Sequence, residues 1–121
     1  MDDDVGHTDK EDSPWFPPDV AQLVQSDQIR LFGLYCLYVF GNPLYLPRIA
    51  DHVTEWVYGE SPRDLQQERL EIYMSLYHDH IPVLVKENIL RYDQAKDHVM
   101  LTDWAKQSTQ HIETMIEDEP L

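Results

Sequence analysis

The stretch from Leu70 to Leu101, LEIYMSLYHDHIPVLVKENILRYDQAKDHVML, constrains the fold more than any other part of the chain. Apolar residues at helical spacing predict an amphipathic helix over residues 65–87. Asn88 tolerates the left-handed conformation and is predicted to end this helix. Two short strands are predicted next, over 89–93 and 97–101. The order of helix, stop and hairpin therefore predicts a long helix followed by a two-stranded ribbon.

Pro82 lies within this predicted helix. Because proline removes one backbone hydrogen bond, we expect the helix to kink there or to split in two. The spacing predicts an inner, core-facing stripe of Leu65, Ile72, Tyr73, Leu76, His80 and Leu84. It predicts an outer stripe of Glu71, Ser75, His78 and Lys86.

Two further helices are predicted upstream. The first begins near Ser26 or Asp27, which can cap it, and ends before Gly41-Asn42-Pro43. It is apolar nearly all round, and a small domain has few elements to cover it. A subunit interface is therefore expected as its second cover, with Leu34 and Tyr38 as contacts.

The second upstream helix is predicted over residues 46–58, with Pro47 in its first turn. A loop over 59–64 follows, in which Asp64 is expected to cap the long helix. Three helices followed by a ribbon predict a mainly α (α+β) fold, a winged helix-turn-helix with a two-stranded wing and an additional C-terminal helix.

The termini are predicted to lie outside this domain, which we expect over residues 21–102. Residues 1–20 are expected to form a disordered acidic tail and a Pro-rich arm, in which Trp15 and Phe16 pack on the domain or on a protein partner. Residues 103–121 are predicted as a helix capped by Asp103. Its apolar side is expected to pair with a second copy in a homodimer, through Trp104, Ile112 and Met115.

The chain is strongly acidic, with 9 Lys and Arg against 23 Asp and Glu and a net charge of −14. Phosphate backbones repel such a chain at low salt. Either the protein avoids nucleic acid, or it works in multimolar salt, where the Debye length is about 3 Å. The scarcity of lysine and the abundance of aspartate favour a halophilic source.

Other sequence features exclude several classes of protein. A single cysteine, Cys36, excludes an intrachain disulfide and a cysteine-based metal site. The N-terminus is acidic and polar, unlike a signal peptide. The longest apolar run, residues 31–41, is too short to cross a membrane. A cytoplasmic protein without a cofactor is expected.

Two sequence motifs resemble those of a known family. Ala50, Asp51, Val53 and Trp56 form the first, and Tyr73 to Pro82 form the second. Together they make residues 29–101 resemble an uncharacterised winged-helix domain family of haloarchaea and their viruses. The segment from Tyr77 to Leu90 also resembles a pattern common in archaeal and bacterial winged-helix repressors. The resemblance implies a DNA-binding transcriptional regulator, but it supplies no established site.

Candidate DNA contacts follow from this architecture. Arg48 at the start of the second helix and the wing residues Arg91 and Lys96 are expected to approach phosphates. The groove-facing residues are expected to be Met74, Ser75 and His78. Arg69 is a further candidate, with a bond to its acidic neighbours Glu68 or Glu71 as the alternative. Residues 46–101 contain six basic and ten acidic residues, so this region is less acidic than the rest without being positive.

The residues bear on three alternatives to DNA binding. His78 and His80 diverge by about 200° on a helix, so they do not predict a metal site. We expect His80 to be a core histidine bonded to backbone and His78 to face outward. Motifs of catalysis are missing from the sequence, so an enzyme is not expected. The remaining alternative is a winged-helix protein-interaction module that binds no nucleic acid.

Overall fold

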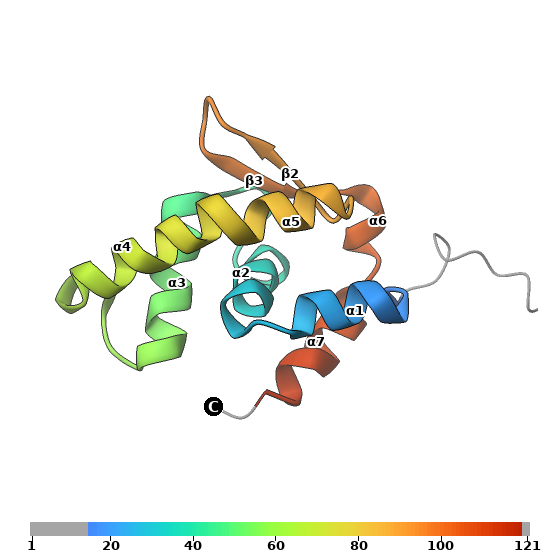
Figure 1. Cartoon of the computed structure of the whole chain (residues 1–121), viewed down its shortest axis with the longest axis horizontal. Helices are drawn as coiled ribbons and strands as arrows, with labels where there is room; N and C mark the ends of the chain where they lie inside the picture. Colours follow the sequence, from blue (N-terminus) through green and yellow to red (C-terminus); the bar gives the residue numbers. More distant parts are fainter. Residues whose placement is uncertain (1–14, 120–121) are drawn as a thin grey trace, which may run out of the picture.

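The computed structural model describes residues 15–119. Its elements, in chain order, are α1 (Pro18–Gln25), α2 (Gln28–Val39), β1 (Leu44–Tyr45), α3 (Leu46–Tyr58), η3 (Pro62–Asp64), α4 (Gln66–Ser75), η4 (Leu76–His80), α5 (Ile81–Lys86), β2 (Leu90–Asp93), β3 (His98–Leu101), α6 (Asp103–Lys106) and α7 (Thr109–Glu117). Figure 1 shows the segment α4–η4–α5 crossing the domain below the ribbon of β2 and β3. The fold is mainly helical with one small antiparallel sheet, which confirms the predicted winged-helix-like α+β class.

Helix α2 lies at the centre of the domain. Asp27 caps it as predicted, because its carboxylate accepts from the backbone N–H groups of Ile29 and Arg30. Helices α1, α3 and α7, together with η4, pack around it. A Cβ atom added at Gly33 would lie 2.9 Å from Leu76 of η4, so these two segments meet closely. The cover that was expected from a second subunit therefore comes from within the chain.

Helix α1 was not predicted. The prolines that indicated an extended arm instead start a helix, with Pro17 at the N-cap and Pro18 in the first turn. Val20 and Val24 are buried on its inner side. Phe16 is 4% exposed, so the expectation that the arm packs on the domain is confirmed for this residue. Our expectations for residues 1–14 fall outside the described part of the chain.

The long helix predicted over residues 65–87 is divided, as Pro82 predicted. The backbone N–H of Ile81 donates to the carbonyl of Leu76, five residues back, so η4 is a single π turn between α4 and α5. Pro82 follows in the first turn of α5. The predicted cap was wrong, because Asp64 belongs to η3. That 3-10 turn begins at Ser61, whose hydroxyl accepts from the backbone of Arg63.

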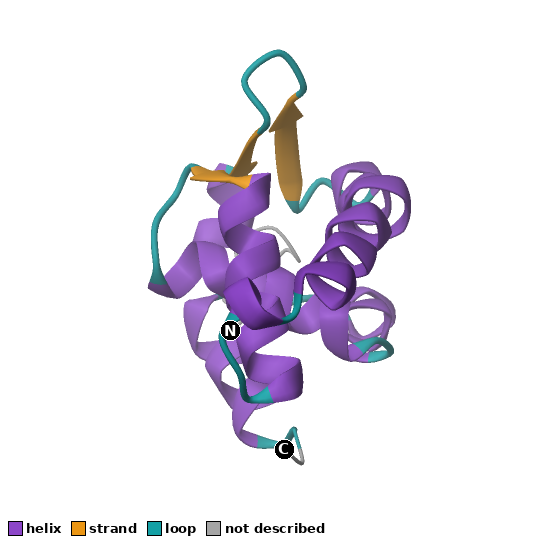
Figure 2. Ribbon diagram, turned by 90° about the vertical axis from the view of Figure 1, so that its left-hand side faces the viewer, coloured by secondary structure: helices purple, strands orange, loops and turns teal. Residues whose placement is uncertain are grey.

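The wing forms at the predicted place. Asn88 has a φ of 62° and ends the helix in the left-handed region, as expected. Strands β2 and β3 pair antiparallel, with Leu90 opposite Leu101. The short strand β1 pairs with the other edge of β3 and gives a third strand that was not predicted. Figure 2 shows the ribbon projecting beyond the helices.

The C-terminal segment folds back onto its own domain. It forms two helices where one was predicted, and Thr102, not Asp103, accepts the capping bond, from the N–H of Ala105. Helix α7 packs against α2. The expected dimer contacts Leu34, Ile112 and Met115 are buried within the chain, so they are not available to a second copy.

The other two expected dimer contacts also have partners inside the chain. The hydroxyl of Tyr38 donates to the carbonyl of Ala105, and Trp104 packs edge-on against Phe16. Both side chains are half-buried. The homodimer itself stays a prediction, but the surface predicted for it is largely the domain's own core.

None of the described helices is long and apolar enough to cross a membrane.

Candidate nucleic-acid interface

The outer face of α4 and η4 is open to solvent. Ile72 and Leu76 point into the core, and the opposite face presents Gln67, Leu70 and Met74. Leu70 is 51% exposed and Met74 is 43% exposed. These three residues lie within about 60° of one another at 100° per residue, so they share one helical face. This face can enter a groove without unfolding any part of the core.

Three residues were expected from the sequence to face a groove. Some lie on this face and one lies at its edge. Met74 and His78 are exposed, as predicted. Ser75 is half-buried and lies about 100° from Met74 around the helix. Leu70 was not among the predicted contacts, although its spacing to Met74 on the same face was visible in the sequence.

Tyrosines hold the wing against the long helix. Asp97, at the end of the wing turn, accepts hydrogen bonds from the hydroxyls of Tyr73 on α4 and Tyr92 on β2. The Tyr73 bond measures 3.0 Å. Burial and the bond to Asp97 raise the pKa of Tyr92, so its hydroxyl stays a donor. Tyr77 packs between the two rings and accepts from the amide of Gln94. The angle between helix and wing is therefore fixed by side chains.

The two cations predicted on the wing are exposed, but they lie on different parts of it. Lys96 lies at the wing tip, where its backbone N–H donates to the side chain of Asp93. Arg91 alternates with Tyr92 along β2, so it projects from the opposite face of the ribbon. Since Tyr92 faces the long helix, Arg91 points away from it. Lys96 is thus the better placed of the two for a partner bound along α4.

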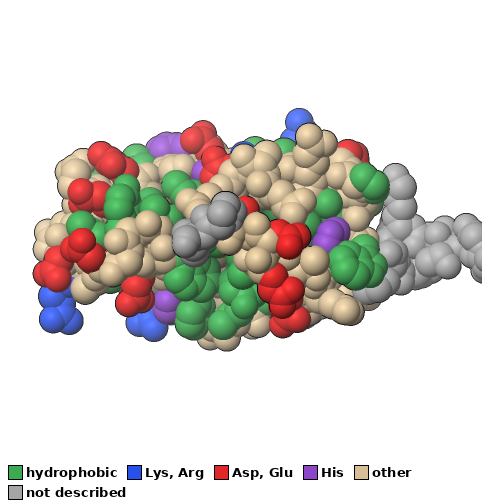
Figure 3. All heavy atoms as spheres, turned by 90° about the horizontal axis from the view of Figure 1, so that it is seen from below, with side chains coloured by type: hydrophobic (Ala, Val, Ile, Leu, Met, Phe, Trp, Pro, Cys, Tyr) green, Lys and Arg blue, Asp and Glu red, His purple; other side chains and the backbone are tan. Residues whose placement is uncertain are grey.

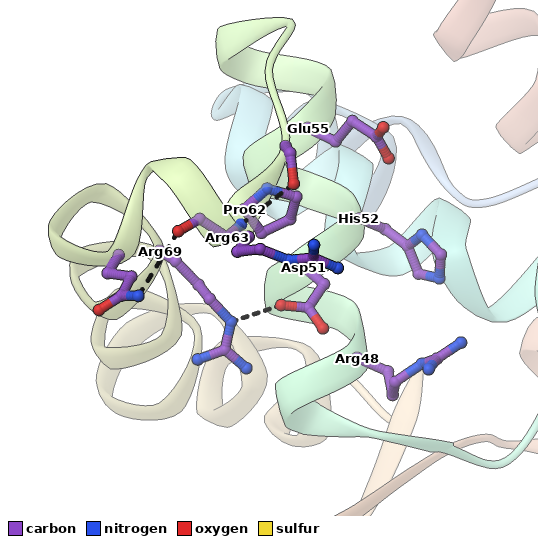
Figure 4. Close-up of a pocket in the computed structure, with 9 residues that line it drawn as sticks. Arg48, Asp51, His52, Glu55, Pro62, Arg63 and Arg69 are labelled. Atoms are coloured by element: carbon purple, nitrogen blue, oxygen red, sulfur yellow. Dashed lines mark hydrogen bonds and ion pairs between the residues drawn. The ribbon is translucent and has the colours of Figure 1, made fainter.

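Three arginines meet in a hollow of about 700 Å³ between α3, η3 and the start of α4. We call it the arginine hollow, and its charged lining residues are Arg48, Asp51, Glu55, Arg63 and Arg69. Figure 4 shows Arg69 reaching from α4 to Asp51 on α3. Arg69 was expected to bond its sequence neighbours if it did not bind DNA. It is instead tied across the hollow to α3.

The other two arginines of the hollow have no anionic partner within residues 15–119. Arg48 is exposed on the first turn of α3, and Arg63 is exposed on η3. With three arginines against two carboxylates, the lining has a net charge of +1. Arg63 was missed in the sequence because the loop gave no sign that it would fold back beside Arg48.

His52 lies beside these arginines. Its ring stacks on Phe40, with 3.7 Å between ring centroids and 1° between planes. Burial lowers the pKa of His52, and the nearby Arg48 guanidinium lowers it further, against the carboxylates of Asp51 and Glu55. The histidine therefore adds no charge to the hollow at neutral pH.

His80 belongs to the core, as predicted, but its partner is not the backbone. Its Nδ1 accepts from Nε of Arg30 at 3.2 Å, and its Nε2 lies 3.6 Å from the Asp27 carboxylate. Across residues 15–119, no three His, Cys, Asp or Glu side chains are grouped so that they could hold a metal ion.

The face opposite the wing has a different character. Figure 3 shows hydrophobic side chains across its middle, acidic side chains on both sides, and Lys or Arg only near its edges. Charge repulsion makes this the less suitable face for a phosphate backbone.

Comparison with known proteins gives one match. The family model described as "Domain of unknown function (DUF7344)" matches residues 23–100, from the end of α1 through most of β3. No curated protein and no solved structure matches the chain.

Proposed function

The chain belongs to the DUF7344 family, a domain family of unknown function, and we propose that it binds double-stranded DNA and regulates transcription. Helix α4 with η4 is the reading helix, and the wing contacts the backbone. The observation that carries this proposal is the arginine hollow beside an unoccupied helical face. It supplies cations for phosphates next to side chains that can reach bases.

The placement of the exposed cations supports this mode of docking. In helix-turn-helix proteins the second helix of the motif lies in the major groove while neighbouring elements touch the backbone. Arg48 and Arg63 flank the start of α4, and Lys96 stands at the wing tip beyond it. Phosphate contacts therefore fall on both sides of the face formed by Gln67, Leu70 and Met74.

The charge of the chain sets the conditions for binding. At low salt the net charge of −14 opposes any approach to DNA. At molar salt, charges separated by more than about 3 Å are screened, so the acidic surface no longer prevents close approach to DNA. We therefore propose a halophilic source, a haloarchaeon or one of its viruses, and a cytoplasmic protein that works at high salt.

A binding titration tests the function. The full chain is titrated into fluorescently labelled duplexes in molar KCl, and anisotropy is measured for a duplex selected from a random library and for a scrambled duplex of equal length. Tighter binding of the selected duplex supports the proposal. Equal binding of both, or none, with helical circular dichroism intact would overturn it.

A homodimer remains part of the proposal. Because Leu34, Ile112 and Met115 are internal, a second copy must contact exposed side chains such as Val39 and Phe40 at the end of α2. Light scattering in molar KCl at micromolar concentration measures the oligomeric state. A monomer under these conditions would contradict the dimer without affecting the DNA proposal.

The second candidate is a protein-interaction module. Leu70, Met74 and Val85 leave apolar surface exposed along α4 and α5, and such surface also suits a protein partner. The arm is a weaker site than expected, since Phe16 is buried in its own domain. A pull-down at native salt that recovers one stoichiometric protein and no DNA would favour this candidate.

A further inference from the structure

The exposed face of the reading helix is formed by Gln67, Leu70 and Met74, and we call it the reading face. Its centre lacks the side chains that recognise guanine. Between Gln66 and His80, Arg69 is the only arginine or lysine, and it is turned away and bound to Asp51. Guanine is recognised in the major groove chiefly by arginine or lysine, which donate to its O6 and N7 atoms. This face therefore offers no strong donor for a G·C pair.

What the face does offer is apolar surface beside an amide. Leu70 and Met74 are exposed one turn apart, and Gln67 lies on the same face within a turn of both. In the major groove, apolar side chains pack against the C5-methyl group of thymine, and glutamine pairs with adenine N6 and N7. Packing against a methyl group also removes the two exposed side chains from water.

Resting on the proposed function, we infer that this face selects A·T base pairs, with Leu70 and Met74 packing against thymine methyl groups. Gln67 pairs with an adenine at the start of the reading helix. In the free protein its amide donates to the Glu71 carboxylate at 3.2 Å, and both residues are exposed, so this bond exchanges readily for a base. Sequence preference then comes from the methyl contacts and from this pairing of glutamine with adenine.

The glutamate on the same helix disfavours guanine at the neighbouring positions. Glu71 is exposed at the edge of the face. Its carboxylate can accept from adenine N6 or cytosine N4 in the major groove, and it repels the O6 and N7 acceptors of guanine.

The test has two stages, both in molar KCl with the full chain. Duplexes are first selected from a random library, and the enriched positions are expected to be A·T pairs. The selected duplex is then compared by anisotropy with the same duplex in which deoxyuridine replaces thymidine, which removes only the methyl groups. We expect binding to weaken about fourfold for each methyl group that is contacted.

Variants assign the effect to the two side chains. The wild type is expected to bind the thymidine duplex more tightly than the deoxyuridine duplex. Leu70→Ala and Met74→Ala are each expected to reduce this difference in affinity. Val85→Ala, which shortens an exposed apolar residue on α5, is the matched control and should keep the full discrimination. All three positions are exposed, so circular dichroism should be unchanged.

The outcomes separate this inference from the function on which it rests. Selective binding of a G·C-rich duplex, or equal binding of thymidine and deoxyuridine duplexes, overturns the inference and leaves DNA binding in place. Absence of any selective binding overturns the proposed function, and the inference with it.

Discussion

Arg69 on α4 donates from its Nε to the carboxylate of Asp51 on α3, and its guanidinium also donates to the carbonyl of Pro47 at 3.2 Å. Helices α3 and α4 are thus joined by side chains that line the arginine hollow. The same contact withdraws Arg69 from the cations available to DNA, although the sequence suggested it as one of them.

Removal of the carboxylate should therefore change stability and affinity in opposite directions. In Asp51→Asn the hollow loses one negative charge, and we expect duplex binding in molar KCl to tighten severalfold. The half-exposed ion pair contributes about 1 kcal/mol or less to the free energy of unfolding. Urea denaturation and anisotropy measure the two effects. Weaker DNA binding by a folded variant would contradict this role for the hollow.

Arg48 and Arg63, the other two arginines of the hollow, should contribute an affinity that is uniform across duplexes. Arg48→Gln and Arg63→Gln are expected to weaken binding to selected and scrambled duplexes alike, and each should reduce the salt slope by about one. Lys106→Gln, on α6 where the lysine pairs with Asp103, is the matched control. If the control lowers affinity as much as the hollow variants do, the hollow is not the phosphate site.

The wing tip should matter more than the wing strand. We expect Lys96→Glu to weaken binding to all duplexes, because it reverses the charge at the tip. Arg91→Glu should have a smaller effect of the same kind, since Arg91 projects from the ribbon face opposite Tyr92. Anisotropy titrations of both variants against the same duplexes measure the difference, and a larger effect of Arg91→Glu would reverse this assignment.

His78 should affect sequence preference and not overall affinity. It is exposed at the end of the reading face, beside Tyr77. We expect His78→Ala to change which duplexes are selected from a random library. An equal loss for every duplex would place His78 on the backbone instead.

The bond between Tyr92 and Asp97 should stabilise the wing. In Tyr92→Phe the carboxylate loses one of its two phenol donors, and we expect the free energy of unfolding to fall by about 1 kcal/mol. Amide hydrogen exchange should accelerate in β2 and β3 before it does in α2. Tyr45→Phe, in which the tyrosine is exposed on β1, is the control and should leave both measurements unchanged.

Stability should fall as the pH drops below about 6.5. Burial lowers the pKa of His80, and Arg30 lowers it further, against Asp27 and Asp79. The unfolded chain then takes up a proton near pH 6.5, while the folded chain keeps His80 neutral. The stabilisation that results is fully present above that pH and is lost below it. Urea midpoints of the wild type and His80→Gln at neutral and mildly acidic pH test this. Equal pH dependence of the two proteins would rule out His80 as its source.

Local chemistry made the segment from α4 to β3 predictable. Pro82 lacks a backbone N–H and Asn88 tolerates the left-handed region, and both acted where predicted. Helix α1 was missed because a proline pair excludes a helix that runs through it, while a helix that begins at the second proline is allowed. Strand β1 was missed because two residues are too few to show a period.

The candidate site was less predictable because its partners are distant in the sequence. Asp51 and Arg69 are 18 residues apart, and Tyr73 and Asp97 are 24 apart, so no local spacing reveals either pair. Leu34, Ile112 and Met115 were predicted at a dimer interface and are buried inside the domain for a similar reason. An apolar side of α2 looks the same in the sequence whether α7 or a second subunit covers it.

The π turn at η4 also lets the long helix carry one extra residue without turning the wing. Five residues wound in a π turn sweep about the same angle as four residues of α-helix. A deletion of one codon within residues 76–80 would therefore restore regular winding and leave the wing at nearly its present angle. A chain of unchanged length that wound regularly through residues 76–80 would instead turn everything after them by about 100°, even with every exposed side chain retained.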